Sequence, residues 1–198
     1  MSDREPDIPL PVINGPEQGP APFQWDAWYR SVGGRSIHIK EVDEIKNRIF
    51  DGQFERFTGD VSPTQTHFET PSDASAIVKG LAKEFGADLV GICAVDPTDV
   101  YKGRTVDEPY AIVVGQRMSY EAFTTVPSDA SAVECMRVYE TLGEVVIQLA
   151  DALRERGYQA TVEHPIGDSR VLHVPLALKA GFGELGRHGS IINPELGP

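Results

Sequence analysis

The sequence is short of cysteine, of basic residues and of long apolar runs, and each shortage excludes a class of protein. Its two cysteines, Cys93 and Cys135, are too few for a disulfide framework or for a metal site built from cysteines alone. No apolar run reaches the length of about 18 residues that a membrane-spanning helix requires. The 18 Lys and Arg face 30 Asp and Glu, and the net charge of −12 argues against binding nucleic acid or anionic lipid through the overall field.

The N-terminal part differs in composition from the rest of the chain. Residues 1–22 hold six of the 15 prolines and predict a flexible or wrapping arm. They contain neither a basic segment followed by an apolar one nor an Arg-Arg pair, so we expect a cytoplasmic protein. Residues 23–70 are interpreted as an N-terminal extension. It begins with four aromatic residues that either dock the arm on the fold or belong to a partner surface: Phe23, Trp25, Trp28 and Tyr29.

Hydrophobic periodicity predicts a mixture of helices and strands. Helices are expected over residues 41–56, 72–85, 129–156 and 175–181. Strands are expected over residues 88–95, 110–115, 158–162, 171–174 and 190–193. The first two strands are apolar on both faces, which is typical of strands buried on both sides. The alternation of strands and helices indicates an α/β fold.

Two of the predicted helices have an apolar face that can be named. On the first, Ser72 is the expected N-cap, and the apolar face consists of Ala76, Ile77, Gly80, Leu81 and Phe85. On the longest, the stripe consists of Met136, Tyr139, Leu142, Val146, Leu149 and Leu153. A tyrosine on such a stripe is usually a core residue.

General motifs do not identify a function. Residues 181–186 match G-x-G-x-x-G, but they follow a helical pattern and not a strand, so they do not indicate dinucleotide binding. Three glycines in six residues form either a tight turn or a surface that touches a large ligand. No phosphate loop or nucleophile elbow is present. The spacing of His164, His173 and His188 fits no common zinc site.

Residues 72–198 resemble the cobalamin-dependent reductive dehalogenases and the related epoxyqueuosine reductases. The resemblance lies in the stretches 87–92, 111–115 with 118–122 and 125–127, Tyr139 with 149–150 and 156–158, and 174–189 followed by 191–197. The last stretch is the most specific, because a helix opened by proline runs into a fixed glycine pattern.

The resemblance implies a cobalamin-binding reductase core over residues 71–198, with a nitroreductase-like α/β sheet and flanking helices that are incomplete in this chain. Two 4Fe-4S clusters would deliver electrons to base-off cobalamin. Because the cysteine motif of these clusters is absent here, they are expected on a missing C-terminal segment or a partner chain. The implied partners are a small-molecule substrate and an electron donor, a ferredoxin-like segment or a reductase. Nucleic acid would enter only as tRNA, in the epoxyqueuosine-like interpretation.

The resemblance also assigns roles to residues. Tyr139 falls on the tyrosine acid of the family, and Asp168 falls in the loop that supplies the second polar group. The cofactor-binding candidates are Ser169, Gly181, Gly183, Glu184, Leu185, Gly186, Arg187 and His188. Asp168 is otherwise a typical turn residue.

The resemblance leaves the function open between several alternatives. A reductive dehalogenase-like enzyme is the main interpretation, and an epoxyqueuosine reductase-like enzyme or a non-catalytic corrinoid-binding protein are alternatives. A flavin-binding nitroreductase-type domain is a further one. No metal ligands are assigned within the chain.

Overall fold

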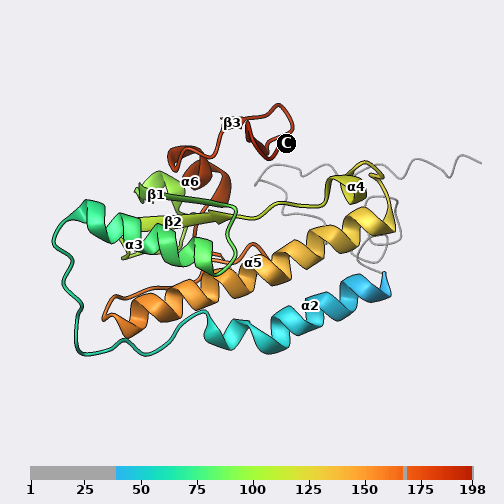
Figure 1. The fold of residues 1–198 in the computed structure, drawn as a ribbon. Coiled ribbons are helices and arrows are strands. Elements are labelled where there is room, and N and C mark those ends of the chain that lie inside the picture. The colour runs from blue at the N-terminus through green and yellow to red at the C-terminus, as the bar shows by residue number, and fades with distance from the viewer. Residues whose placement is uncertain (1–38, 167–168, 198) are drawn as a thin grey trace, which may run out of the picture.

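The computed structural model describes residues 39–166 and 169–197, and Figure 1 shows how their elements are arranged. The predicted arm, the four aromatic residues that follow it and Asp168 lie outside the described residues. The helices are α2 (Lys40–Gly52), α3 (Pro71–Glu84), α4 (Tyr120–Phe123), α5 (Asp129–Glu155) and α6 (His173–Lys179), with short 3-10 turns η2 (Phe54–Arg56) and η3 (Pro97–Asp99). The strands are β1 (Leu89–Ala94), β2 (Tyr110–Gly115), β3 (Glu184–Leu185) and β4 (Ile191–Ile192).

The centre of the fold is a small sheet between helices. β1 and β2 pair antiparallel, with Gly91 opposite Val113. α3 and α5 pack on one face of this sheet. With Ala87 from the turn between α3 and β1, they form a core of Val78, Ala82, Ala87, Val145, Leu149 and Leu153. α6 covers the other face, and α2 lies along the opposite side of α5 (Figure 1). The mixed helix and strand composition is therefore confirmed, but the described residues form two sheets of only two strands each.

α5 is the longest element, and local sequence explains its bounds. Ser128 caps its N-terminus: the Ser128 side chain accepts from Ser131 N, and the Ser131 side chain accepts from Ser128 N. After Glu155 the chain turns at Gly157, whose φ of 82° favours glycine. Residues of its stripe face the sheet or α2. The predicted bounds of α5, and those of β2, are thus confirmed.

The predicted face of α3 was partly wrong. The N-cap is Thr70, with Pro71 in the first turn, two residues earlier than expected. The buried residues are Val78 and Ala82, whereas Ile77 is 43% exposed. The sheet therefore touches a neighbouring stripe of the helix, because the packing of β1 and β2 decides which of two adjacent apolar rows is covered.

Two predicted strands were also wrong. Residues 158–162 form no ladder, although Ala160 and Val162 pack against the core. Residues 171–174 contribute only an isolated bridge between Val171 and Val100, and α6 begins at His173 and not at Pro175. An apolar run becomes a strand only where a second strand pairs with it. β1 and β2 are themselves mostly half-buried, less covered than their apolar sequences predict.

Candidate active site

A cavity of about 420 Å³ lies against one edge of the β1–β2 sheet. Every residue of β2 lines it, whereas no residue of β1 does. α5 forms a second wall with residues from Tyr139 to Leu153, and α6 contributes Leu176 and Ala177. The remaining wall is the segment 159–165. The size is within the range of about 300–1,000 Å³ that is typical of small-molecule sites.

Tyr139 is the most N-terminal residue of α5 in this lining, so it marks one end of the cavity. Its side chain is half-buried, and burial is the main cause that raises the pKa of the Tyr139 hydroxyl above 10. Cys135, one helical turn earlier, shares a side-chain hydrogen bond with Tyr139, and burial raises the pKa of that thiol as well. The phenol is therefore neutral at pH 7 and holds a proton that it can donate.

His164 holds the backbone of Tyr139. The Ile166 N–H donates to His164 Nδ1 at 3.1 Å, so the ring proton is on Nε2, which donates to the Tyr139 carbonyl oxygen at 2.9 Å. The residue is 3% exposed and stacks on Phe57 with ring centroids 5.7 Å apart. Burial is the main cause that lowers the pKa of His164 below 6.5, which keeps the ring neutral.

This contact requires glycine at position 143 of α5. A Cβ at Gly143 would lie 2.9 Å from His164 Nε2 and 2.3 Å from the buried Gln53 Oε1. Gln53 comes from the N-terminal extension and donates through Nε2 to the Glu140 carbonyl at 2.8 Å. The part of the extension around η2 therefore packs directly behind the candidate site.

A charged network joins two walls of the cavity. Arg170 donates through Nε to Glu163 Oε1 at 2.6 Å, and its Nη2 lies 3.4 Å from Glu108 Oε1. Thr161 Oγ1 donates to the same Glu108 oxygen at 2.7 Å. Although burial opposes ionisation, the hydrogen bond from Thr161 and the neighbouring Arg170 charge lower the pKa of Glu108. Its other oxygen, Oε2, is buried and has no hydrogen-bond partner among the described residues.

Ser169, a predicted cofactor contact, belongs to this network. Its hydroxyl donates to Glu163 Oε2 at 3.1 Å and lies at the same distance from the Val171 carbonyl. The loop is also tied to η3, because Leu172 N donates to the Asp99 carbonyl at 2.7 Å. Ser169 does not itself line the cavity, but its hydrogen bond to Glu163 holds it beside a residue that does.

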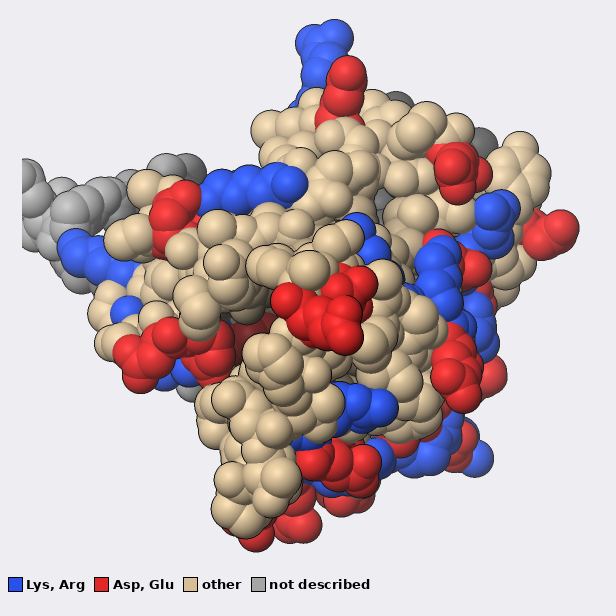
Figure 2. Space-filling model, turned by 60° about the vertical axis from the view of Figure 1, so that its left-hand side comes forward, with Lys and Arg blue, Asp and Glu red and all other residues tan. Residues whose placement is uncertain are grey.

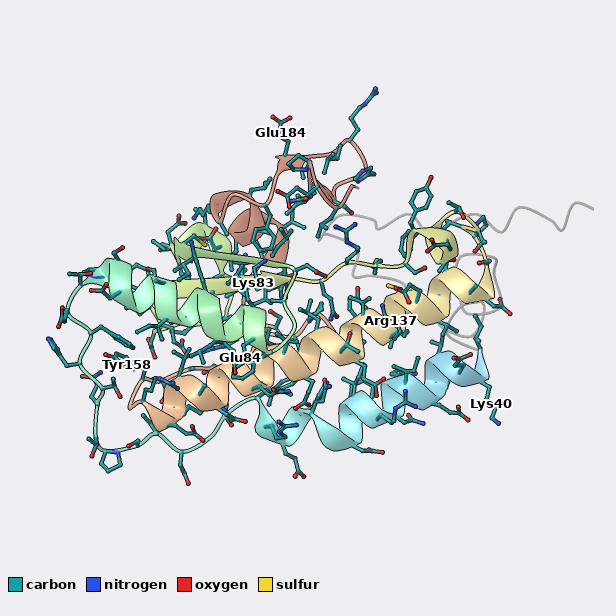
Figure 3. All side chains as sticks on the ribbon, in the orientation of Figure 1. Lys40, Lys83, Glu84, Arg137, Tyr158 and Glu184 are labelled. Atoms are coloured by element: carbon teal, nitrogen blue, oxygen red, sulfur yellow. The ribbon has the colours of Figure 1, made fainter. Side chains whose placement is uncertain are left out.

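The other predicted cofactor contacts lie on a separate part of the molecule. Gly181 and Gly183 follow α6, and the remaining residues form or connect β3 and β4: Glu184, Leu185, Gly186, Arg187 and His188. This hairpin projects from the body, with Glu184 pointing outward in Figure 3. Leu185 is 59% exposed and Ile192 is 46% exposed. Because Leu185 pairs with Ile191 and Ile192 pairs with Glu184, these two exposed side chains lie on opposite faces of the hairpin.

The glycine pattern of the hairpin has a structural cause at Gly183. Its φ is 148°, and a Cβ there would lie 2.1 Å from the Ile192 carbonyl oxygen. The hairpin can therefore close only with glycine at this position. Gly181 and Gly189 also have positive φ, but a Cβ at either would meet nothing within 4 Å.

The structure thus divides the predicted residues between a cavity, which has Tyr139 at one end and Ser169 near its rim, and the hairpin. Sequence reasoning did not assign His164, Glu108 or Arg170 to the site. His164 directly follows the ionisable Glu163, and nothing local indicates its partner Tyr139, which is 25 residues away. Nothing in the sequence indicates which carboxylates Arg170 contacts.

The described part of the chain contains neither a cluster of metal ligands nor a membrane-spanning helix. There, no group of three or more His, Cys, Asp or Glu side chains is arranged to hold a metal ion. No helix within 39–166 or 169–197 is long and apolar enough to cross a membrane. On the face of the described residues shown in Figure 2, acidic and basic side chains are interspersed, and no broad basic surface is visible.

Comparison with known proteins gives homologues of one kind. No family model matches the chain. Tetrachloroethene reductive dehalogenases from Desulfitobacterium hafniense and Dehalobacter restrictus are 30% identical to it over 68% of the chain. The aligned part is 32% of those proteins, so the chain spans about a third of the length of these curated relatives.

Solved structures agree with this similarity. The catabolic reductive dehalogenase NpRdhA in complex with 3-bromo-4-hydroxybenzoic acid has a TM-score of 0.68 and 26% identity, covering 79% of this chain and 24% of that one. A reductive dehalogenase described with a mechanism for B12-dependent dehalogenation has a TM-score of 0.63 and 28% identity, covering 78% and 23%. Sequence and fold both support a relationship to the reductive dehalogenase family.

Proposed function

We propose that this chain is the substrate- and corrin-facing part of a cobalamin-dependent reductive dehalogenase that acts on a small organohalide. The observation that carries the proposal is the neutral phenol of Tyr139 at the end of a mostly apolar cavity, in a chain homologous to reductive dehalogenases. Replacing halogen by hydrogen at carbon requires two electrons and one proton. Cobalamin, when bound, supplies the electron chemistry.

The residues of the hairpin and its surroundings fit a large, flat cofactor. The hairpin offers one exposed apolar side chain on each face, Leu185 on one and Ile192 on the other, with open space beside Gly181 and Gly189 where backbone can approach a ligand. Arg187 and His188 are exposed beside it and can contact the phosphate of a nucleotide tail. Ser169 and the adjoining loop are assigned to the rim of the same site.

In this proposal Tyr139 delivers the proton. A phenol of raised pKa is a weak acid, so the phenolate must be stabilised by a nearby cation as it forms. Arg170 is the one Lys or Arg among the described residues that line the cavity, and Glu163 and Glu108 already partly neutralise it. We therefore assign the stabilising cation to a group outside the described residues.

The remaining parts of the proposal concern the source of electrons, the complete sheet and a second proton donor. Electrons would come from 4Fe-4S clusters on a further segment or on a partner chain in the cytoplasm. The β1–β2 sheet would be one portion of a larger, nitroreductase-like sheet. Asp168 would act as a second donor, chiefly for a leaving oxygen, and this role stays a prediction.

The test is Tyr139→Phe in the full-length enzyme reconstituted with cobalamin, because it removes one hydroxyl and keeps the ring. We expect turnover of an organohalide to fall about 100-fold or more. The absorbance spectrum and the amount of corrinoid retained after gel filtration should not change. Normal turnover would show that Tyr139 is a packing residue and not the proton donor. A protein that retains flavin and no corrinoid would refute cobalamin as the cofactor.

Tyr158→Phe is the matched control. The Tyr158 hydroxyl donates to the Thr66 carbonyl at 2.6 Å, and this residue lies near the C-terminal end of α5 (Figure 3). The same atom is thus removed where it has a structural role. We expect a loss of about 0.5–1.5 kcal/mol in stability, because water can reach the exposed Thr66 carbonyl, and unchanged turnover per folded enzyme.

A further inference from the structure

Two consecutive carbonyls of α5 accept hydrogen bonds from side chains outside the helix. His164 Nε2 donates to the Tyr139 carbonyl at 2.9 Å, and Gln53 Nε2 donates to the Glu140 carbonyl at 2.8 Å. Carbonyls in the interior of an α-helix normally accept only the N–H four residues later. The turn of α5 that carries Tyr139 is therefore held from outside the helix at two neighbouring points.

Both donors are buried, so water does not compete for either contact. Gln53 is 5% exposed and His164 is 3% exposed. A buried N–H that loses its partner is left unsatisfied, which makes each of these hydrogen bonds costly to break. The two contacts therefore restrict how this turn of α5 can move.

Gln53 carries a polar atom that packing alone does not explain. Its Oε1 is buried and has no hydrogen-bond partner among the described residues. The same atom would lie 2.3 Å from a Cβ at Gly143, so it fits against α5 only because that residue is glycine. An apolar side chain would avoid the cost of an unpaired oxygen. What glutamine adds at this position is the N–H that it donates to the Glu140 carbonyl.

The segment 53–57, which comprises η2 and its flanking residues, contacts both points. Gln53 reaches α5 directly, and Phe57 stacks on His164 with ring centroids 5.7 Å apart. The His164 ring in turn lies edge-on to the Tyr139 ring, with centroids 6.2 Å apart. A displacement of this segment would therefore reach Tyr139 through its backbone and through its ring.

From these contacts we propose that Gln53 is a positioning residue for the proton transfer assigned to Tyr139, and that it acts together with His164. Gln53 does not line the cavity, so it contacts neither substrate nor cofactor. It keeps the Tyr139 hydroxyl in one orientation, and a displacement of about 1 Å can lower a reaction rate about 100-fold. The inference rests on the proposed function and gives the segment 53–57 of the N-terminal extension a part in it.

Gln53→Met in the full-length enzyme reconstituted with cobalamin tests the proposal, because methionine has a similar length and lacks the N–H. We expect kcat for an organohalide to fall about tenfold or more, while KM and the corrinoid retained after gel filtration stay within about twofold. Gln148→Met is the matched control. Gln148 Nε2 donates to the Glu144 side chain at 3.3 Å and not to the helix backbone, so kcat should not change.

Combination with Tyr139→Phe distinguishes positioning from packing. If Gln53 acts through the Tyr139 hydroxyl, Gln53→Met should lower kcat by less than about twofold once that hydroxyl is absent. An equal loss with and without the hydroxyl, or a wild-type kcat in Gln53→Met, would overturn this inference and leave the proposed function standing. Normal turnover in Tyr139→Phe alone would overturn both.

Fluorine NMR of 3-fluorotyrosine placed at position 139 of the full-length protein gives a measurement that needs neither turnover nor cofactor. In Gln53→Met the signal should shift or split, because the ring is no longer held in one orientation. In Gln148→Met it should match the wild type. If Gln53→Met does not fold, His164→Phe replaces it in the combination with Tyr139→Phe, because it removes the other donor and keeps a ring against Phe57. A wild-type signal in folded Gln53→Met would overturn the inference.

Discussion

The helical platform, consisting of α2, α3, α5 and the β1–β2 sheet, and the hairpin end, residues 181–197, are stabilised in different ways. Among the described residues, no buried hydrophobic residue lies after Ala177. The platform is held by core packing, whereas the hairpin end is held by backbone conformation and a few hydrogen bonds. Asn193 Nδ2, for example, donates to the Phe182 carbonyl at 2.6 Å.

Because of this difference, the residues that stabilise the fold and the predicted cofactor contacts lie mostly in different regions. Tyr139 is placed by a 27-residue helix that cannot move without disturbing the core. Apart from Ser169, the predicted cofactor contacts belong to the hairpin end, where we expect substitutions to leave the platform folded. Substitutions in the first region should therefore change the free energy of unfolding, and substitutions in the second should change ligand binding.

The largest effect on stability is expected at Arg154. Its guanidinium is 3% exposed and donates to the carbonyls of Phe57 at 2.7 Å and Ala160 at 2.9 Å, which ties the extension and the 158–162 segment to α5. Arg154→Met keeps the apolar stem but removes the donor to the Ala160 carbonyl and one of the two donors to the Phe57 carbonyl, which also accepts from Val162 N at 2.9 Å. We expect the free energy of unfolding in urea to fall by about 3–5 kcal/mol.

Arg117→Met is the control for this change. Its side chain is exposed, so the same substitution should alter stability by about 0.5 kcal/mol or less. If the two variants unfold at the same urea concentration, the platform does not depend on the Arg154 contacts.

An intermediate and more local effect is expected at Gly183. Gly183→Ala places a methyl group against the Ile192 carbonyl and imposes a strained φ of 148°, so the β3–β4 hairpin cannot close in its present form. We expect corrinoid retention by the full-length protein to fall about tenfold or more, an effect of about 1–3 kcal/mol. The melting temperature of the platform should change little.

Gly189→Ala separates this contact from a general effect of positive φ. Gly189 has a φ of 83° and open space where the alanine methyl group would lie, so only the backbone cost of about 1 kcal/mol applies. Corrinoid retention should then be reduced less than in Gly183→Ala. Similar corrinoid retention in both variants would show that cofactor binding does not depend on the shape of the hairpin.

The smallest effect concerns pH and arises at His164, whose side chain contacts the platform at Tyr139. Its folded-state pKa lies below the ordinary value of 6.5 because of burial, so the unfolded chain binds the proton first. The stability that the neutral ring contributes is complete above pH 6.5 and is lost as pH falls below it. The slope from this one group is at most about 1.4 kcal/mol per pH unit.

His164→Gln should remove this component while keeping a side-chain N–H near the Tyr139 carbonyl. Urea unfolding at pH 7 and pH 5.5 should show a smaller pH dependence in this variant than in the wild type. His67→Gln, at an exposed loop position, should retain the wild-type slope. An unchanged slope in His164→Gln would show that other groups control acid sensitivity in this range.

The local sequence was sufficient to predict those helices and strands whose bounds are determined within the segment itself. The periodicity between Ser128 and Gly157 predicted α5, and the apolar run at 110–115 predicted β2, because caps and repeats within the segment determine both. The resemblance likewise pointed to the reductive dehalogenase family, which the homologues support. It assigned Tyr139 a role that its place at the end of the cavity accommodates.

Tertiary structure decided everything that depends on a partner distant in sequence. Which row of α3 is buried depends on the position of β1 and β2, and whether residues 158–162 become a strand depends on an edge to pair with. α6 begins at His173 because Leu172 N is bonded to the Asp99 carbonyl, 73 residues earlier in the chain. The contact between His164 and Tyr139 exists only because Gly143 leaves room for it. Periodicity records which side chains avoid water, but pairing, register and close approach are fixed only when the surfaces meet.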